Sequence, residues 1–73
     1  MIKQKRSFAE RLKALREEKG LSQAQLAINL NYAISSSAIG MWELGKREPA
    51  LSAVILLANY FKVSLEYMAG LED

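Results

Sequence analysis

LSQAQLA at residues 21–27 and IGMWELGKREP at residues 39–49 decide the fold of this chain. Each stretch predicts a short helix. The small side chain of Ala27 lets the two helices cross closely, because a larger one would push them apart. A Trp-Glu pair and a basic Gly-Lys-Arg turn follow the second helix. Since no other feature of the chain could carry chemistry, its function has to be inferred from the shape and charge of its surface.

Start and stop signals extend the helical prediction over the whole chain. Ser7 and Ser22 each precede an acid or amide by three positions, the pattern of a capping box. Gly20, Gly45 and Gly70 are suited to the left-handed residue that follows a helix, and no alternating strand pattern competes. We therefore expect an all-α domain of five helices: about Phe8 to Lys19, one after Ser22 to about Leu30, Ser35 or Ser36 to Leu44, one after Pro49 through Phe61, and a short one after Ser64.

The apolar residues of these helices recur at the spacing of a buried face. This periodicity predicts the core, which would contain Phe8, Leu12, Leu15, Leu26, Ala27, Leu30, Ala38, Ile39, Trp42, Leu51, Val54, Leu57, Ala58 and Phe61. A chain of 73 residues forms one domain, close to the lower limit at which such a core suffices without disulfides or metals.

Composition excludes several classes of function. The chain has no cysteine and no histidine, which removes thiolate sites, the commonest general base and the commonest metal ligand. Its acids are not clustered, so we expect no metal, no cofactor, no small-molecule ligand and no enzymatic activity. No apolar run approaches the length of a bilayer and no secretory signal is present, so we expect a cytoplasmic protein without membrane contact.

Charge is distributed unevenly, although the net charge is only +2. Seven of the ten basic residues lie in the first 19 positions: Lys3, Lys5, Arg6, Arg11, Lys13, Arg16 and Lys19. A well-solvated first helix with a basic terminus explains this pattern by itself. An alternative is that residues 1–6 form a basic arm that contacts a phosphate backbone, followed by a helix-turn-helix domain over residues 7–73.

The residues from Gln23 to Pro49 resemble the helix-turn-helix of the lambda-repressor-like Cro/repressor class, also called the XRE family. The resemblance continues from Phe8-x-x-x-Leu12-x-x-Leu15-Arg16 to Val63-Ser64-Leu65-Glu66-Tyr67-Met68-x-Gly70, nearly the whole chain. It implies a compact five-helix lambda-repressor-like domain that binds double-stranded DNA. The expected function is that of a prokaryotic or phage transcription regulator, a repressor, with the third helix in the major groove.

The resemblance also implies roles for individual residues. Gln23 would contact a phosphate, in keeping with its place on the first turn of a helix, where free N–H groups and the positive dipole end meet an anion. Lys46 and Arg47 would clamp the phosphate backbone next to the recognition helix. Arg16 and Glu43 would form an ion pair of the scaffold. The base-reading positions fall on Ser36, Ser37, Gly40 and Met41.

The chain departs from the family pattern in two ways. The span from Gln23 to Trp42 is two residues longer than usual, with Asn31 nearest the place of the usual glycine; a longer second helix or a bulged turn would accommodate this. The recognition face also lacks the Arg, Asn or Gln that discriminates a base by about 1–3 kcal/mol. Shape readout, a base contact from Asn31 or Tyr32, or modest specificity would each compensate.

This weak recognition face supports an alternative. Tyr32, Ile34 and Met41 would form an apolar surface for a protein partner on the same fold. Exchanging Met41 for arginine should strengthen DNA binding in the first case and damage partner binding in the second. A candidate dimer patch lies near the C-terminus, and a homodimer is expected to accompany DNA binding; the patch consists of Leu65, Tyr67, Met68 and Leu71.

Overall fold

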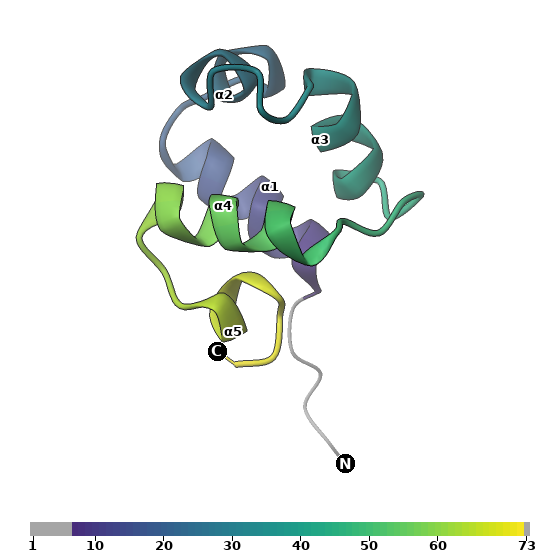
Figure 1. Ribbon diagram of the computed structural model, residues 1–73, viewed down its shortest axis with the longest axis vertical. Coiled ribbons are helices and arrows are strands. Elements are labelled where there is room, and N and C mark those ends of the chain that lie inside the picture. The colour runs from purple at the N-terminus through teal and green to yellow at the C-terminus, as the bar shows by residue number, and fades with distance from the viewer. Residues whose placement is uncertain (1–6, 73) are drawn as a thin grey trace.

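Five helices build the structure, a computed structural model that describes residues 7–72 (Figure 1). No strand occurs among these residues, which confirms the all-α expectation. The helices are α1 (Phe8–Glu18), α2 (Gln23–Asn29), α3 (Ser36–Glu43), α4 (Leu51–Phe61) and α5 (Leu65–Met68). None of the helices within residues 7–72 has the length and apolar character to cross a membrane.

Serine side chains set the starts of four helices. Ser7, Ser22, Ser35 and Ser64 each accept a hydrogen bond from the backbone N–H three residues later. At α1 the capping box is complete, because the Glu10 carboxylate accepts the N–H of Ser7 at 3.0 Å. At α2 only half of it forms, since the Gln25 amide instead donates to Asn29 Oδ1 at 2.9 Å.

The helices enclose a core that most of the predicted residues share. α1 packs against α3 and α5, α2 packs against α3, and α4 packs against α5. In Figure 1, α2 and α3 lie at one end of the molecule and α5 lies at the other. The buried apolar side chains are Leu12, Leu26, Ala27, Leu30, Ile34, Ile39, Trp42, Val54, Leu57, Ala58, Phe61 and Met68.

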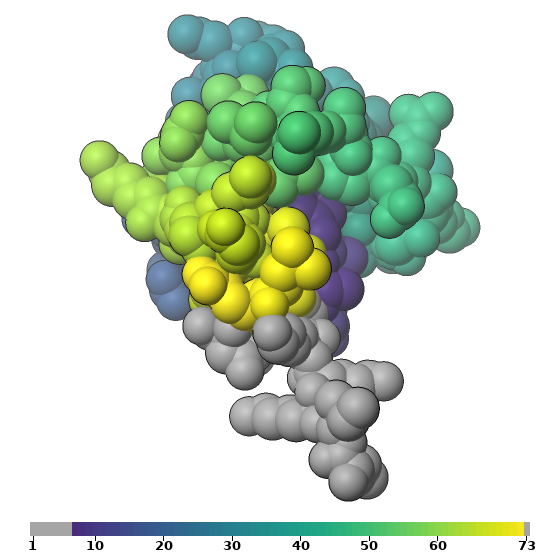
Figure 2. All heavy atoms as spheres, turned by 60° about the horizontal axis from the view of Figure 1, so that its bottom comes forward, coloured from purple at the N-terminus to yellow at the C-terminus, as the bar shows by residue number. Residues whose placement is uncertain are grey.

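The C-terminal segment closes the end opposite to α2 and α3. Figure 2 shows it packed beside α1. The buried guanidinium of Arg11 lies 3.9 Å from the centre of the Tyr67 ring, a cation–π contact. Arg11 Nη2 also donates to the carbonyl oxygen of Glu72 at 2.5 Å. Arg11 therefore stabilises this end of the molecule. It is one of the seven basic residues of the first 19 positions, but its contacts are within the fold.

Three predicted exposures are wrong. Leu51, predicted to face inward, is 66% exposed at the first position of α4, whose buried side chains begin only at Val54. Ile34, predicted to belong to an exposed protein-binding patch, is only 6% exposed, since the turn before α3 folds it into the core. Met68, predicted for the dimer patch, is fully buried in the core by the packing of α5 on α1 and α4.

The two extra residues between α2 and α3 form a longer turn and not a longer helix. α2 ends at Asn29, and α3 begins only at Ser36. Asn31 has a φ of 55°, so it takes the left-handed conformation for which glycine is usual at this place. The bulged turn is thus the alternative that the chain adopts.

Candidate nucleic-acid interface

Helix α3 is anchored on one side and open on the other. Its buried side chains are Ile39 and Trp42, and the Trp42 ring meets the Phe8 ring edge-on at 5.9 Å between centroids. The Ser35 hydroxyl fixes the first turn by accepting the N–H of Ala38 at 3.1 Å. On the opposite side, Ser36, Ser37, Met41 and Leu44 are exposed. The helix therefore presents a firm outward surface.

An ion pair between Arg16 and Glu43 joins α1 to α3. Arg16 Nε donates to Glu43 Oε2 at 2.7 Å, and Nη2 donates to Oε1 at 2.9 Å, a two-pronged arrangement. The third donor, Nη1, reaches the carbonyl oxygen of Leu21 at 2.7 Å, just before α2. The structure thus brings together the two residues that the resemblance paired, and ties them to the start of the helix-turn-helix.

The hydrogen bonds that Arg16 donates to the Glu43 carboxylate raise the pKa of the Arg16 guanidinium above its ordinary value, and burial opposes this effect only partly. A basic group whose pKa is raised by folding stabilises the folded state at every pH at which it is protonated in both the folded and the unfolded chain. This stabilisation is lost as the pH rises through the raised pKa. Since an arginine titrates only in strong alkali, the protonation of Arg16 does not make this stabilisation vary with pH around neutrality.

Gln23 is held in place by Glu43 and by the absence of a side chain at position 40. Its Nε2 donates to Glu43 Oε1 at 3.1 Å. A Cβ atom on Gly40 would lie only 3.2 Å from Gln23 Oε1. Gly40 thus admits the Gln23 amide beside α3, and this accounts for a glycine inside a helix, where it costs about 1 kcal/mol relative to alanine. Gly40 was predicted to face the bases, whereas its backbone lies against Gln23.

A hollow of about 320 Å³ opens where α1, the start of α2 and α3 meet. Its lining consists of Lys13, Arg16, Gln23, Gly40, Glu43 and Leu44. Arg16 and Glu43 neutralise each other, so the exposed Lys13 supplies the net positive charge. Lys13 and Leu44 are not among the site residues that the sequence predicts. The signal was available for Lys13, because it lies three positions before Arg16 and hence on the same face of a helix.

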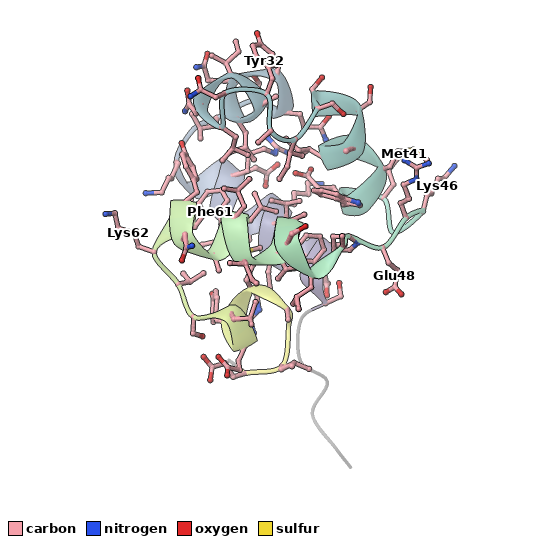
Figure 3. The ribbon with its side chains drawn as sticks, in the orientation of Figure 1. Tyr32, Met41, Lys46, Glu48, Phe61 and Lys62 are labelled. Carbon is pink, nitrogen blue, oxygen red and sulfur yellow. The ribbon has the colours of Figure 1, made fainter. Side chains whose placement is uncertain are left out.

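The basic turn follows α3 on the same side of the molecule as Met41. Gly45 has a φ of 72°, and the N–H of Lys46 donates to the carbonyl oxygen of Met41 at 3.0 Å, which closes the helix. Lys46 and Arg47 are exposed. Figure 3 shows Met41 and Lys46 pointing outward together. The turn therefore brings two cations to the C-terminal end of the exposed face of α3.

The remaining predicted site residues are only partly accessible. In the candidate dimer patch, Leu65 and Leu71 are exposed and Tyr67 is half-buried beneath Arg11. In the proposed protein-binding surface, Tyr32 and Met41 are exposed but are no longer connected by Ile34. The predicted basic arm, residues 1–6, lies outside the described residues.

Comparison with known proteins adds to this geometry. Residues 12–68 match the model of a family described as Helix-turn-helix. The HTH-type transcriptional regulator YqaE of Bacillus subtilis is 39% identical over 61 residues, which are 84% of this chain and 51% of that protein. The B. subtilis regulator YobD is 33% identical over 66 residues, 90% of this chain and 57% of that protein.

A solved structure agrees with these relatives. The crystal structure of a transcriptional regulator from Listeria innocua matches with a TM-score of 0.78 and 31% identity, over 97% of this chain and 64% of that chain. The present chain spans about half the length of these two curated relatives.

Proposed function

Because this chain belongs to the lambda-repressor-like Cro/repressor (XRE) helix-turn-helix family, we propose that it binds double-stranded DNA as a transcription regulator. In this proposal α3 enters the major groove. One observation carries it: the exposed face of α3 has the fixed Gln23 amide along its side and the Lys46-Arg47 turn at its C-terminal end. A duplex backbone flanks a major-groove helix on both sides, so donors and cations are needed at those places.

In this proposal the hollow beside Gln23 receives a phosphate. One amide hydrogen of Gln23 is used by Glu43 at 3.1 Å, which leaves the other free to donate to a phosphate oxygen. Lys13 on the rim adds a positive charge. Such contacts fix the position of the protein on the duplex without reading its sequence.

Base recognition would come from Ser36, Ser37 and Met41, while Gly40 would act by admitting the Gln23 amide beside α3. Serine hydroxyls both donate and accept, so they discriminate little, and the Met41 side chain suits the methyl group of thymine. We therefore propose modest direct readout, with part of the specificity arising from DNA shape. Occupation of a promoter by the bound protein would repress transcription.

Two copies are proposed to bind together, through the exposed Leu65 and Leu71 near the C-terminal end. Their half-sites would then lie about 34 Å apart, one turn of the duplex. The test is selection of bound fragments from a random pool of duplexes, followed by titration of the best fragment at two salt concentrations. Enrichment of a sequence with two half-sites supports the proposal, whereas no retardation of any duplex at low salt refutes it.

Replacement of Gln23 by alanine is expected to weaken binding of all duplexes about equally, by about tenfold, because a phosphate contact carries no sequence information. Affinity should be measured by fluorescence anisotropy for the selected duplex and for a scrambled one. Ala24→Ser, at an exposed position next in the chain, is the control and should bind normally. A change in preference between the two duplexes without a general loss would contradict the assignment.

Replacement of Gly40 by alanine tests the contact that holds Gln23. The new methyl group would lie 3.2 Å from Gln23 Oε1, so the amide would have to shift by a few tenths of an ångström, while alanine favours the helix by about 1 kcal/mol. We therefore expect a higher melting temperature together with DNA affinity reduced several-fold. Gly40→Ala combined with Gln23→Ala should bind no worse than Gln23→Ala alone. Independent, additive losses would show that Gly40 acts without Gln23.

A further inference from the structure

The turn between α2 and α3 contains two consecutive residues in a conformation that side chains disfavour. Asn31 has a φ of 55° and Tyr32 has a φ of 59°. Left-handed backbone brings Cβ close to the following carbonyl oxygen, so residues other than glycine adopt it rarely, and bulky ones most rarely. Among residues 7–72, the only other non-glycine residue with a positive φ is Lys62, at 58°.

The closure of α2 explains Asn31 but does not require a left-handed Tyr32. The N–H of Asn31 donates to Ile28 and that of Tyr32 donates to Ala27, both at 2.9 Å, the paired bonds of a Schellman motif. The same pair of bonds ends the other described helices, including α1 at Gly20 and α3 at Gly45. There only one residue is left-handed. The second strained residue is therefore particular to this turn.

The Tyr32 ring contributes little to packing. The residue after the left-handed position often makes an apolar contact with its helix; of the corresponding residues, Leu21 and Val63 are half-buried, whereas Lys46 and Leu71 are exposed. Tyr32 is 71% exposed and so belongs with the second group. Within residues 7–72 its hydroxyl has no hydrogen-bond partner. The backbone is thus strained to present a large side chain that the fold does not use, and such strain is concentrated at functional sites.

The position of Tyr32 points to the ligand. It lies three residues before Ser35, the N-cap of α3, and Figure 3 shows it at the end of the molecule that α2 and α3 form. Its exposed neighbours toward α3 are polar or small (Ala33, Ser35, Ser36), since Ile34 is buried. A single ring among such residues is not a contiguous apolar patch for a protein. A tyrosine hydroxyl is, however, a common donor to DNA phosphates.

We propose that Tyr32 is a further DNA-contacting residue, whose hydroxyl donates to a phosphate at the edge of the groove that the N-terminal end of α3 enters. This inference rests on the proposed function. It assigns a role to the two-residue extension of the turn: the longer turn extends the contact surface beyond α3, whose own exposed face carries few long polar side chains.

The experiment compares Tyr32→Phe and Tyr32→Gly with the unaltered chain, on the duplex selected from the random pool. Tyr32→Phe should bind about 3- to 10-fold more weakly, the effect of one lost hydrogen bond. Tyr32→Gly should bind at least as weakly, yet its melting temperature should rise by about 4–8 °C, because glycine relieves the left-handed strain. Ethylation of one particular phosphate should weaken DNA binding by the unaltered chain but not by Tyr32→Phe. A merely structural role of Tyr32 would not produce this difference.

Lys62→Gly is the matched control. It relieves the same strain at a φ of 58°, on a residue that Figure 3 places away from α3. It should raise the melting temperature and leave DNA affinity unchanged. If the unaltered chain binds DNA and both Tyr32 variants bind equally well, the inference is wrong. If the unaltered chain binds no duplex, the proposed function itself fails, so the two failures are distinguishable.

Discussion

Glu43→Ala is expected to lower the free energy of unfolding by about 3–5 kcal/mol, because it leaves the Arg16 guanidinium buried without its partner. The side chains of Arg16 and Glu43 are only 11% and 5% exposed, and two hydrogen bonds join them. The variant also loses the hydrogen bond from Gln23 to Glu43. Urea unfolding followed by Trp42 fluorescence measures this loss, since Trp42 is adjacent to Glu43 and buried.

Two further variants distinguish an uncompensated charge from a simple loss of contact. Arg16→Met combined with Glu43→Leu should recover at least half of the stability lost by Glu43→Ala, because apolar replacement of a buried pair is often neutral. Glu18→Ala, at an exposed position of α1, should change stability by less than about 0.5 kcal/mol. A double variant less stable than Glu43→Ala would contradict the explanation.

The double variant Lys46→Ala and Arg47→Ala is expected to cause the largest loss of DNA affinity. Both cations are exposed beside α3 on the Gly45 turn. Each phosphate contact releases counterions, so the slope of log affinity against log salt should fall by about 0.9 per contact, or about 2 for the pair. At low salt the affinity should fall by about tenfold for each contact.

Fluorescence anisotropy at several salt concentrations measures both quantities. Lys62→Gly removes a basic side chain that Figure 3 shows on the opposite side of the molecule from Lys46. For this variant the slope of log affinity against log salt should equal that of the unaltered chain. Since phosphate contacts do not read sequence, selected and scrambled duplexes should be affected alike. An unchanged salt slope in the double variant would show that Lys46 and Arg47 do not contact phosphates.

Local sequence signals predicted the helices well, because capping acts between residues only three apart. The serines before α1, α2, α3 and α5 bond to the third residue of each helix, and this geometry requires no tertiary context. The spacing of apolar residues predicted most of the core for a similar reason, because it too depends only on residues a few positions apart in one helix. The prediction failed for Leu51, since periodicity assigns it to a face but cannot tell that the buried side chains of α4 begin only at Val54.

The family resemblance predicted most residues of the candidate site, and the structure showed which of them contact one another. The resemblance paired Arg16 with Glu43, 27 positions apart in the chain. Only the folded chain places Gly40 against the Gln23 amide and Lys13 on the rim of the hollow. These contacts depend on how closely α2 and α3 cross, which no spacing within either helix specifies.

The sequence by itself thus determined that this chain is a five-helix, helix-turn-helix domain, since helix starts, helix ends and apolar faces depend on residues that are close together in the chain. Tertiary structure alone decided the path of the turn between α2 and α3, which buries Ile34 and exposes Tyr32. The physical reason is that Ile39 and Trp42 anchor α3 in the core, while Glu43 ties it to Arg16 of α1. The longer turn spans the distance between the end of α2 and this fixed helix.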